Sequence, residues 1–440
     1  MSGLPTIKYS GKIREIKIGK PGSELVLGGE TGYNFYSFEG KTPNAPKLAL
    51  QILDIQPDEW ADAALEPFKD VVKDPVKWAK KCVDEYKADA VCLWLAGTDP
   101  NGKNLPASHA AEVTKKVAAA INVPLIVWGT SNDEKNTEVL KAVCESCQGM
   151  NLVIGPVTEH NYKQIGAQAI AYGHVVGANS PIDINLAKQL NILLENLGVA
   201  GDKILIDPTT GGVGYGMEYC YSIMERIRQA ALMQNDEKLQ YPILSNIAEE
   251  VWKTKEAKLP TKEEPTLGEA TTRGINLESI TAVSVLQAGA DLVILRHPET
   301  LSHVRKYISG LMVETSLDAL DVDMSLVPAE APAAAKAAPA AKAAPAAKPA
   351  PAAKPAPVKA APPQAEAQAP AAEPEPTPAP KPELKIAEKP AAPPKPVPVS
   401  ATGEVDLADV DFTDEEVAAI RELLSAFKAI KGIVKLVSKF

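Results

Sequence analysis

The stretch "HVVGANSPIDINLAKQLNILLENLGVAGDKILIDP", residues 174–208, predicts a strand, a helix and a second strand in succession. Its two ends, 174–179 and 203–208, are apolar runs of strand length, and the segment between them, 183–197, is amphipathic. A strand, a crossover helix and a second strand are typical of a parallel sheet with helices packed on its face. This stretch therefore predicts an α/β protein.

The helix inside this stretch carries its own start and stop signals. Ser180 and Pro181 would supply an N-cap and a proline in the first turn, and Gly198 would end the helix. Four leucines recur at helical spacing and predict the buried stripe: Leu186, Leu190, Leu193 and Leu197.

The same alternation of apolar runs and amphipathic segments continues through residues 1–325. Eight near-continuous apolar runs of this kind predict parallel strands covered by helices. The length suits a (β/α)₈ TIM barrel, with room for an N-terminal hairpin over 5–35. An open doubly wound sheet is the alternative, but the even spacing of the eight units favours the closed barrel. The runs span 47–54, 90–97, 124–130, 151–156, 174–179, 203–208, 242–248 and 291–297.

The composition changes sharply near Val327, where alanine, proline and lysine take over, as in "PAAAKAAPAAKAAPAAKPAPAAKPAPVKAAPP". Proline at this density opposes helix and sheet, and alanine with lysine cannot build a core. The sequence therefore predicts a first domain over 1–325, followed by a disordered, solvated linker over 326–402.

A helix signal follows this linker, within residues 403–440. Thr413 and Glu416 fit a capping box, and acidic residues precede a lysine-rich end, as the helix dipole favours. A lone helix cannot bury an apolar stripe, so we expect this segment to dock on a partner, a second copy or the main domain. The alternative is a flexible tail that is helical only in part. The stripe consists of Val417, Ile420, Leu424 and Phe427.

The overall composition excludes several classes of function. The 440 residues carry a formal net charge of −10, which argues against non-specific nucleic-acid binding. No apolar run reaches the ~18 residues of a membrane span, and the N-terminal segment has no apolar core of a secretory signal. We therefore expect a cytoplasmic protein without a membrane span, whose five cysteines stay reduced.

In a barrel of this type the functional face lies at the carboxyl ends of the strands. The residues expected there are mostly neutral hydrogen-bonding groups with a few acids. Such a lining suits a large polar organic ligand, or the surface of a partner, better than a metal ion. The candidates taken from these ends are Asp99, Asn132, Asn179, Asp207, Thr209, Thr210, Asn246 and His297.

The sixth strand end continues into a loop with four glycines, "GGVGYG" at 211–216. The loop fails the dinucleotide fingerprint because Met217 stands where the third glycine is needed. It also fails the P-loop pattern, since Met217 and Glu218 replace the Lys-Ser/Thr pair. Two interpretations stay open. Glycines such as Gly212 and Gly214 let a flat, bulky ligand approach the backbone, or the turn needs positive φ angles.

Three other chemistries find little support. Cys144 and Cys147 form one pair on a predicted helix with no second pair at zinc or cluster spacing, so we expect them to be buried. Asp99 and Asp207 could act as an acid–base pair, but each precedes a proline and could equally form a turn. His297 could contact a ligand or simply cap the next helix. The sequence thus assigns no catalytic and no metal-ligating residue.

Several of these motifs together resemble one family: the small (delta) subunit of the corrinoid iron–sulfur protein of acetyl-CoA synthase/CO dehydrogenase complexes. The likeness covers residues 5–312, and the combination is specific although each piece alone is weak. The linker and the C-terminal helix lie outside it. The matching stretches are "HVVGANSPIDINLAKQLNILLENLGV" with "KILIDPTTGGVGYGMEYCYSIMERIRQAAL", and "TDPNGK" (98–103), "EHNYKQIG" (159–166) and "GADLVILRHPE" (289–299).

The resemblance implies a TIM barrel that pairs with a large (gamma) subunit. That subunit would hold the iron–sulfur cluster and most of the corrinoid, a cobalamin-type cofactor, with no cluster on this chain. The pair would shuttle a methyl group between a methyl-tetrahydropterin methyltransferase and acetyl-CoA synthase in the reductive acetyl-CoA (Wood–Ljungdahl) pathway. The chain itself would be a non-catalytic subunit that covers the corrinoid.

On this basis Asn179, Asp207, Thr209, Thr210, Gly212 and Gly214 are expected to face the cofactor or its carrier domain. Two other functions stay open. In the first, the barrel is itself a pterin-dependent methyltransferase, with Asp99, Asn132 and Asn246 holding the pterin by its hydrogen-bonding edge. In the second, the chain is purely architectural and organises the complex without touching the cofactor.

Overall fold

A computed structural model of the chain describes residues 7–58 and 60–312. The predicted linker over 326–402 and the predicted helix within 403–440 lie outside the described residues, as does the end of the predicted first domain beyond residue 312. Within the described part, no helix combines the length and the apolar character needed to cross a membrane.

Eight parallel strands close into a barrel in the order β10-β3-β4-β5-β6-β7-β8-β9. The predicted (β/α)₈ barrel is thereby confirmed, and each of the eight apolar runs supplies one strand. The strands are β3 (Lys47–Leu53), β4 (Ala90–Trp94), β5 (Leu125–Trp128), β6 (Val153–Val157), β7 (Val175–Asn179), β8 (Ile204–Asp207), β9 (Ile243–Asn246) and β10 (Ala290–Leu295).

The strands are mostly apolar because both of their faces are buried. The interior of the barrel covers one face and the surrounding helices cover the other. All six residues of β10 are buried, for example, as are all four residues of β5. The last strand pairs with the first, with Leu292 opposite Lys47 and Leu295 opposite Leu50, and this pairing closes the barrel.

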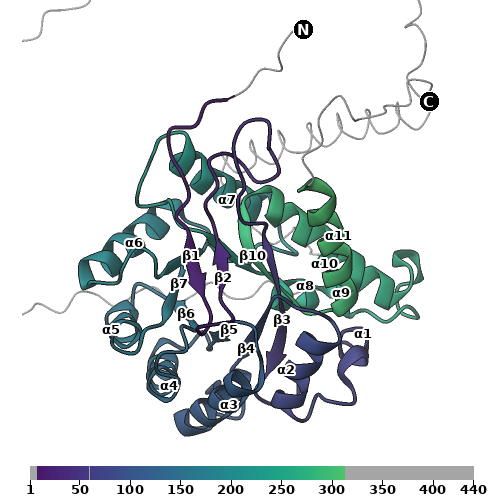
Figure 1. The fold of residues 1–440 in the computed structure, drawn as a ribbon. Coiled ribbons are helices and arrows are strands. Elements are labelled where there is room, and N and C mark those ends of the chain that lie inside the picture. Colours follow the sequence, from purple (N-terminus) through teal and green to yellow (C-terminus); the bar gives the residue numbers. More distant parts are fainter. Residues whose placement is uncertain (1–6, 59, 313–440) are drawn as a thin grey trace, which may run out of the picture. The chain divides into compact units, whose positions relative to one another are not determined.

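Helices form a ring around the strands (Figure 1). The α-helices are α1 (Asp62–Leu65), α2 (Pro75–Asp84), α3 (Ala107–Ala120), α4 (Asp133–Ser146), α5 (Tyr162–Tyr172), α6 (Ile184–Leu197), α7 (Met217–Leu232), α8 (Ala248–Lys253), α9 (Lys255–Lys258), α10 (Ala270–Gln287) and α11 (Pro298–Leu311). Three short 3₁₀ helices are η1 (Glu66–Phe68), η2 (Ala96–Thr98) and η3 (Pro265–Leu267). Short connections keep each of these helices close to its strand.

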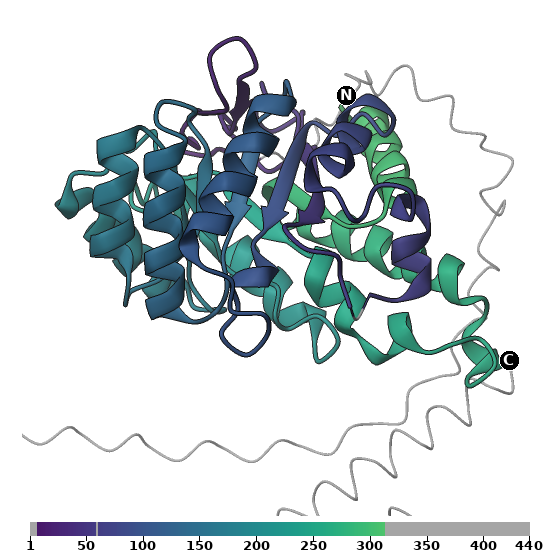
Figure 2. The same cartoon turned by 90° about the horizontal axis from the view of Figure 1, so that it is seen from below.

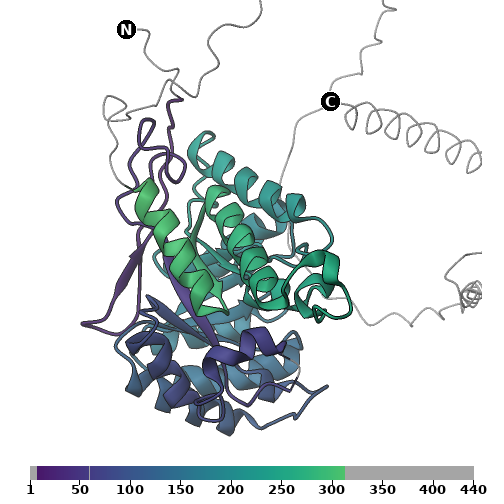
Figure 3. The same ribbon diagram turned by 90° about the vertical axis from the view of Figure 1, so that its right-hand side faces the viewer.

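The predicted N-terminal hairpin is present as β1 (Ile16–Ile18) and β2 (Leu25–Leu27), an antiparallel pair. It lies over the residues that lead into the strands: the Gly19 amide donates to the carbonyl of Asn151, and the Arg14 amide donates to the carbonyl of Gln240. The hairpin therefore covers the amino ends of the strands, and Figures 2 and 3 show it at one end of the barrel.

Helix α6 begins later than the sequence predicts. Its N-cap is Asp183, whose carboxylate accepts from the amides of Asn185 (2.7 Å) and Leu186 (3.2 Å), and not Ser180. The backbone amide of Ser180 still donates to the carbonyl of Asp207, so the chain is held against β8 until it turns at Ile182. Gly198 ends the helix in the left-handed conformation, as predicted.

The buried face of α6 is also rotated relative to the predicted leucine stripe. Of the four predicted leucines only Leu190 is fully buried, and Asn191 beside it is buried too. The side-chain NH₂ of Asn191 donates to the carbonyl of Lys238 at 2.8 Å, whereas its Oδ1 has no partner among the described residues. Hydrophobic spacing alone therefore misplaced the stripe. The buried residues of the helix are Ala187, Leu190, Asn191 and Leu194.

A buried ion pair joins α7 to the last strand. The guanidinium of Arg228 contacts the carboxylate of Asp291, and both side chains are about 2% exposed. Arg228 Nε also donates to the carbonyl of Gly289 at 3.0 Å. Neither charge has access to water, and a buried charge without its partner would be strongly destabilising. The ion pair and its hydrogen bonds therefore link α7 to β10.

Candidate functional site

Four adjoining cavities, of about 290 to 520 Å³, lie at the carboxyl ends of the strands. We call this region the mouth. It is lined by residues that end β3, β4, β5, β7, β8 and β9, and by α8. Glu249 lines three of the four cavities, as do Glu250 and Lys253. The hairpin closes the opposite end, so the mouth is the open face of the barrel.

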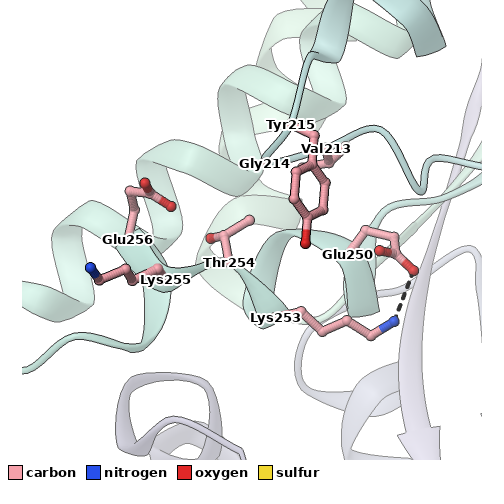
Figure 4. A pocket seen from close by; sticks show the side chains of 8 residues that line it. All are labelled: Val213, Gly214, Tyr215, Glu250, Lys253, Thr254, Lys255 and Glu256. Carbon is pink, nitrogen blue, oxygen red and sulfur yellow. Dashed lines mark hydrogen bonds and ion pairs between the residues drawn. The ribbon is translucent and has the colours of Figure 1, made fainter. Parts of the chain in front are cut away.

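The charged centre of the mouth comes from α8, which begins directly after β9. Lys253 Nζ lies 2.7 Å from Glu249 Oε1 and 3.0 Å from Glu250 Oε1, and the second pair is drawn in Figure 4. Burial opposes the charge of Lys253, but the two carboxylates outweigh it and raise its pKa. These three residues were missed among the candidates taken from the sequence. The sequence did contain a signal for them, because Glu249 and Glu250 directly follow the apolar run 242–248.

Asn179 and Asp207, at the ends of neighbouring strands, lie together in the mouth. Asn179 Nδ2 donates to Asp207 Oδ2 at 2.7 Å, and the Thr209 amide donates to Asp207 Oδ1 at 3.0 Å. Burial raises the pKa of Asp207 to about 6, against the opposing effect of these two hydrogen bonds. Thr209 has a φ of 59°, a left-handed conformation that is costly for a β-branched residue. The Asp207 carboxylate caps this strained turn.

Thr210 and Asn246 are also neighbours in the mouth. Thr210 Oγ1 donates to the main-chain carbonyl of Asn246 at 2.5 Å. The side-chain oxygen of Asn246 is buried without a hydrogen-bond partner among the described residues, and so are the hydroxyls of Thr130 and Ser180. These three residues end or follow β9, β5 and β7. Buried polar atoms normally have partners, so the unpartnered ones indicate where a ligand or water would bind.

The floor of the mouth is an indole ring. Trp128, the last residue of β5, lines two of the cavities and is 8% exposed. Gly155 and Gly177 on the next two strands make room for it, because a Cβ at either position would come within 2.9 Å of the ring. Both glycines belong to strands that the sequence predicts, but Trp128 was not among the candidate site residues.

Asp99 and Asn132 both form local turns. Asp99 lines two of the cavities, and its Oδ1 accepts from the amide of Asn101 at 2.8 Å. Asn132 is the N-cap of α4, where its Oδ1 accepts from the amide of Lys135 at 2.9 Å. Its neighbours Ser131 and Asp133 line the mouth, whereas Asn132 itself lines none of the four cavities. Asn246 lines the mouth, so the structure separates it from Asn132, with which it was grouped as a possible pterin-binding residue.

His297 occupies the capping position that the sequence left open as an alternative. Its Nδ1 accepts from the amide of Glu299 at 3.2 Å, at the start of α11. The imidazole stacks on Trp252, with 6.1 Å between ring centroids, and lines none of the four cavities. Burial lowers the pKa of His297 to about 4, so the ring is neutral at physiological pH.

The glycines of the loop after β8 have different structural reasons. Gly212 is buried, and a Cβ there would lie 2.9 Å from Cys220 Sγ and 3.1 Å from the carbonyl of Gly216. Its small size is explained by packing inside the protein, and the expectation that it faces a cofactor stays a prediction. Gly211 and Gly214 do line cavities, and Gly214 has a φ of 91°. In Figure 4, Tyr215 projects from this loop toward the Glu250–Lys253 pair.

The cysteines contribute no ligand set to the mouth. All five are free and buried, including Cys144 and Cys147 as expected. Burial raises the pKa of Cys144 to about 12, so its thiol stays protonated and unreactive. Among the residues that the structure describes, no group of three or more His, Cys, Asp and Glu side chains is arranged to hold a metal ion.

Comparison with known proteins places the chain in a family. A family model described as "CO dehydrogenase/acetyl-CoA synthase delta subunit" matches residues 15–305. The chain is 35% identical over 316 residues to the acetyl-CoA decarbonylase/synthase complex subunit delta of Archaeoglobus fulgidus, covering 69% of each chain. It is also 35% identical over 297 residues to the corresponding subunit of Methanopyrus kandleri, covering 66% of this chain and 72% of the relative.

Solved structures with a similar arrangement include a dihydropteroate synthase from Xanthomonas albilineans with 4-aminobenzoic acid, at 14% identity and a TM-score of 0.47. That alignment covers 69% of this chain and all of the synthase, and a likeness at this level carries no information on function. The family model covers most of the barrel, and the relatives match over two thirds of their own length. The chain belongs to the CO dehydrogenase/acetyl-CoA synthase delta subunit family.

Proposed function

We propose that the chain is the barrel subunit of a two-subunit corrinoid iron–sulfur methyl carrier. Its large (gamma) partner subunit carries the corrinoid and the iron–sulfur cluster, and the mouth of this barrel covers one face of the corrinoid. The pair moves a methyl group between a methyl-tetrahydropterin methyltransferase and acetyl-CoA synthase. The observation that carries the proposal is the set of unpartnered polar atoms at the mouth of a barrel from this family.

The mouth suits a broad, flat, amide-fringed ring. The Asn246 oxygen and the Thr130 hydroxyl line the mouth and are free to bond peripheral amides, and the Trp128 indole offers an apolar floor. Each cavity is small for an organic ligand of this size, which supports covering one face of the ring rather than enclosing it. The corrinoid would supply the cobalt chemistry of methyl transfer.

In this arrangement the residues of the chain bind, orient and exclude water. Asn179 is held by Asp207 at 2.7 Å, so its amide is fixed in orientation before a ligand arrives. Preorganised hydrogen-bonding groups lose less entropy on binding than mobile ones do. Lys253 offsets one of the two negative charges of Glu249 and Glu250, which lowers the electrostatic cost of bringing a large ligand over them.

The test co-expresses the full chain with its large subunit and measures cobalt retained by the purified pair. Thr130→Val and Asn246→Leu remove polar atoms that have no partner within the described chain, so both variants should fold normally. We expect each to lower the cobalt retained per pair. Thr114→Val is the matched control, because its hydroxyl is also buried and unpartnered but sits on α3. Retention equal to that of the control would contradict the proposal.

Two results would favour the other functions. Transfer of a methyl group from methyl-tetrahydrofolate to free cobalamin by this chain alone would identify a pterin-dependent methyltransferase. A stable pair in which neither variant changes cobalt content, even when corrinoid is in excess, would identify an architectural subunit that never touches the cofactor.

A further inference from the structure

A buried arginine stands at one side of the mouth. Arg296 follows directly after β10, is 4% exposed, and lines a cavity of about 370 Å³. The amides of Arg296 and His297 both donate to the carboxylate of Glu278, at 2.6 and 3.1 Å, and this fixes the backbone of the segment. The guanidinium is therefore held at a defined place beside the cavity.

The guanidinium of Arg296 is held by neutral groups and has no direct ion pair among the described residues. Its Nε and Nη2 both donate to Gln51 Oε1, at 3.1 and 2.7 Å, and its guanidinium carbon lies 4.0 Å from the centroid of the Trp60 ring. Among the described residues Nη1 has no hydrogen-bond partner, and no carboxylate lies within 4.0 Å of the guanidinium. Gln51 Nε2 is also buried without a partner. Glu278, Glu249 and Glu250 favour the charged form of Arg296, but none of them forms an ion pair with its guanidinium, so Nη1 is left for a direct anionic partner.

The acids near this cavity are already engaged. Glu249 pairs with Lys253 at 2.7 Å, and Asp58 lies 3.6 Å from the Nζ of Lys103. Asp99 caps a turn through the amide of Asn101. Burial lowers the pKa of Arg296 to about 10, so the group stays charged at neutral pH.

The remaining wall of the cavity is apolar and aromatic. Leu53, Ile55, Trp60 and Trp94 line it, and Lys258 is a further cation among the lining residues. A ligand that fits this lining has an acidic group at one end and a flat apolar body at the other.

We propose that this cavity is a binding site for the oxyanion group, carboxylate or phosphate, of a small aromatic molecule. The oxyanion accepts from Arg296 Nη1, and the ring of the ligand lies against Trp60 and Trp94. The site uses only side chains of this chain, so the proposal does not depend on whether the mouth covers a corrinoid.

The test titrates the full-length chain with phenyl phosphate, benzoate and benzamide by isothermal calorimetry at constant ionic strength. Benzamide has nearly the shape of benzoate but no charge. We expect phenyl phosphate, benzoate or both to bind about tenfold or more tightly than benzamide, as a charge-assisted hydrogen bond requires. The stronger of the two acids identifies the natural oxyanion. Equal affinity for the acids and benzamide would overturn the proposal.

Two variants test the role of the arginine. Gln51→Glu keeps the shape of the side chain but gives Arg296 an internal carboxylate, so anion binding should fall about tenfold or more while the protein stays folded. Arg296→Met should abolish the preference for acids over benzamide. Arg305→Met is the control, because Arg305 pairs with Asp89 on the outside of the barrel. Acid binding by Gln51→Glu at the level of this control would contradict the proposal, even if Arg296→Met does not fold.

Discussion

Asp207 offers a direct test of the electrostatics of the mouth. Its carboxylate is held by Asn179 and by the amide of Thr209, yet burial raises its pKa to about 6 from an ordinary value of 3.8. Asp207→Asn removes the titrating group. The oxygen of the substituted side chain can still accept from Thr209 N–H, and Asn179 can turn its own amide to offer an oxygen to the new NH₂ group.

Protonation of Asp207 is linked to folding, so this residue makes the unfolding free energy depend on pH. Because the pKa of Asp207 is higher in the folded state, protonation favours folding, and this contribution is fully present below about pH 4. It is lost as pH rises through about 6. A shift of about two pKa units corresponds to about 3 kcal/mol of unfolding free energy. The asparagine variant carries no such contribution, so its stability should lack this fall between pH 4 and pH 7.

The assay is urea unfolding of the full chain at pH 4, 5, 6 and 7, for the wild type and for Asp207→Asn. Taking the difference between the two proteins at each pH cancels the contribution of all other titrating groups. We expect the variant to gain up to about 3 kcal/mol relative to the wild type between pH 4 and pH 7. Asp84→Asn, on the exposed side of α2, is the control. Parallel profiles for wild type and Asp207→Asn would refute the reasoning.

Two further predictions concern packing and buried charge. Gly212→Ala should lower the unfolding free energy by about 1–3 kcal/mol, because the added Cβ would lie 2.9 Å from Cys220 Sγ. Gly211→Ala is the control and should change it by less than about 0.5 kcal/mol, since nothing lies within 4 Å of the added Cβ. Equal thermal midpoints for the two variants would contradict this prediction. Arg228→Met removes the only cation paired with the buried Asp291 carboxylate among the described residues and should cost about 3–5 kcal/mol. Arg305→Met, at a pair that is about a third exposed, should cost at most about 1 kcal/mol. Urea unfolding at pH 7 measures both, and similar losses would refute the second prediction.

The barrel could be predicted because its signals are local and repeated. Each strand is buried on both faces, so it appears in the sequence as a continuous apolar run, as in 291–297. The start of α6 could not be predicted in the same way. Ser180 has the right side chain for a cap, but its backbone is held by Asp207, which is distant in sequence. The contact that moved the cap to Asp183 exists only once β7 and β8 are paired.

The mouth was predicted in outline but not in its details. Strand ends identify residues such as Asn179 and Asp207, because parallel strands place their carboxyl ends together. Lys253 was missed because it reaches the mouth from a short helix and its importance comes from pairing with two acids. Trp128 was missed because an aromatic residue at a strand end is usually part of the core. Only the glycines on neighbouring strands reveal that its ring fills the floor.

The central claim is that the barrel covers a corrinoid carried by another subunit. The most direct measurement is cobalt content and visible spectrum of the full chain, purified alone and then co-expressed with its large partner subunit. The account predicts cobalt and a corrinoid spectrum in the pair and none in the chain alone. A stoichiometric corrinoid in the chain alone, or a stable pair without cobalt when corrinoid is in excess, would contradict it.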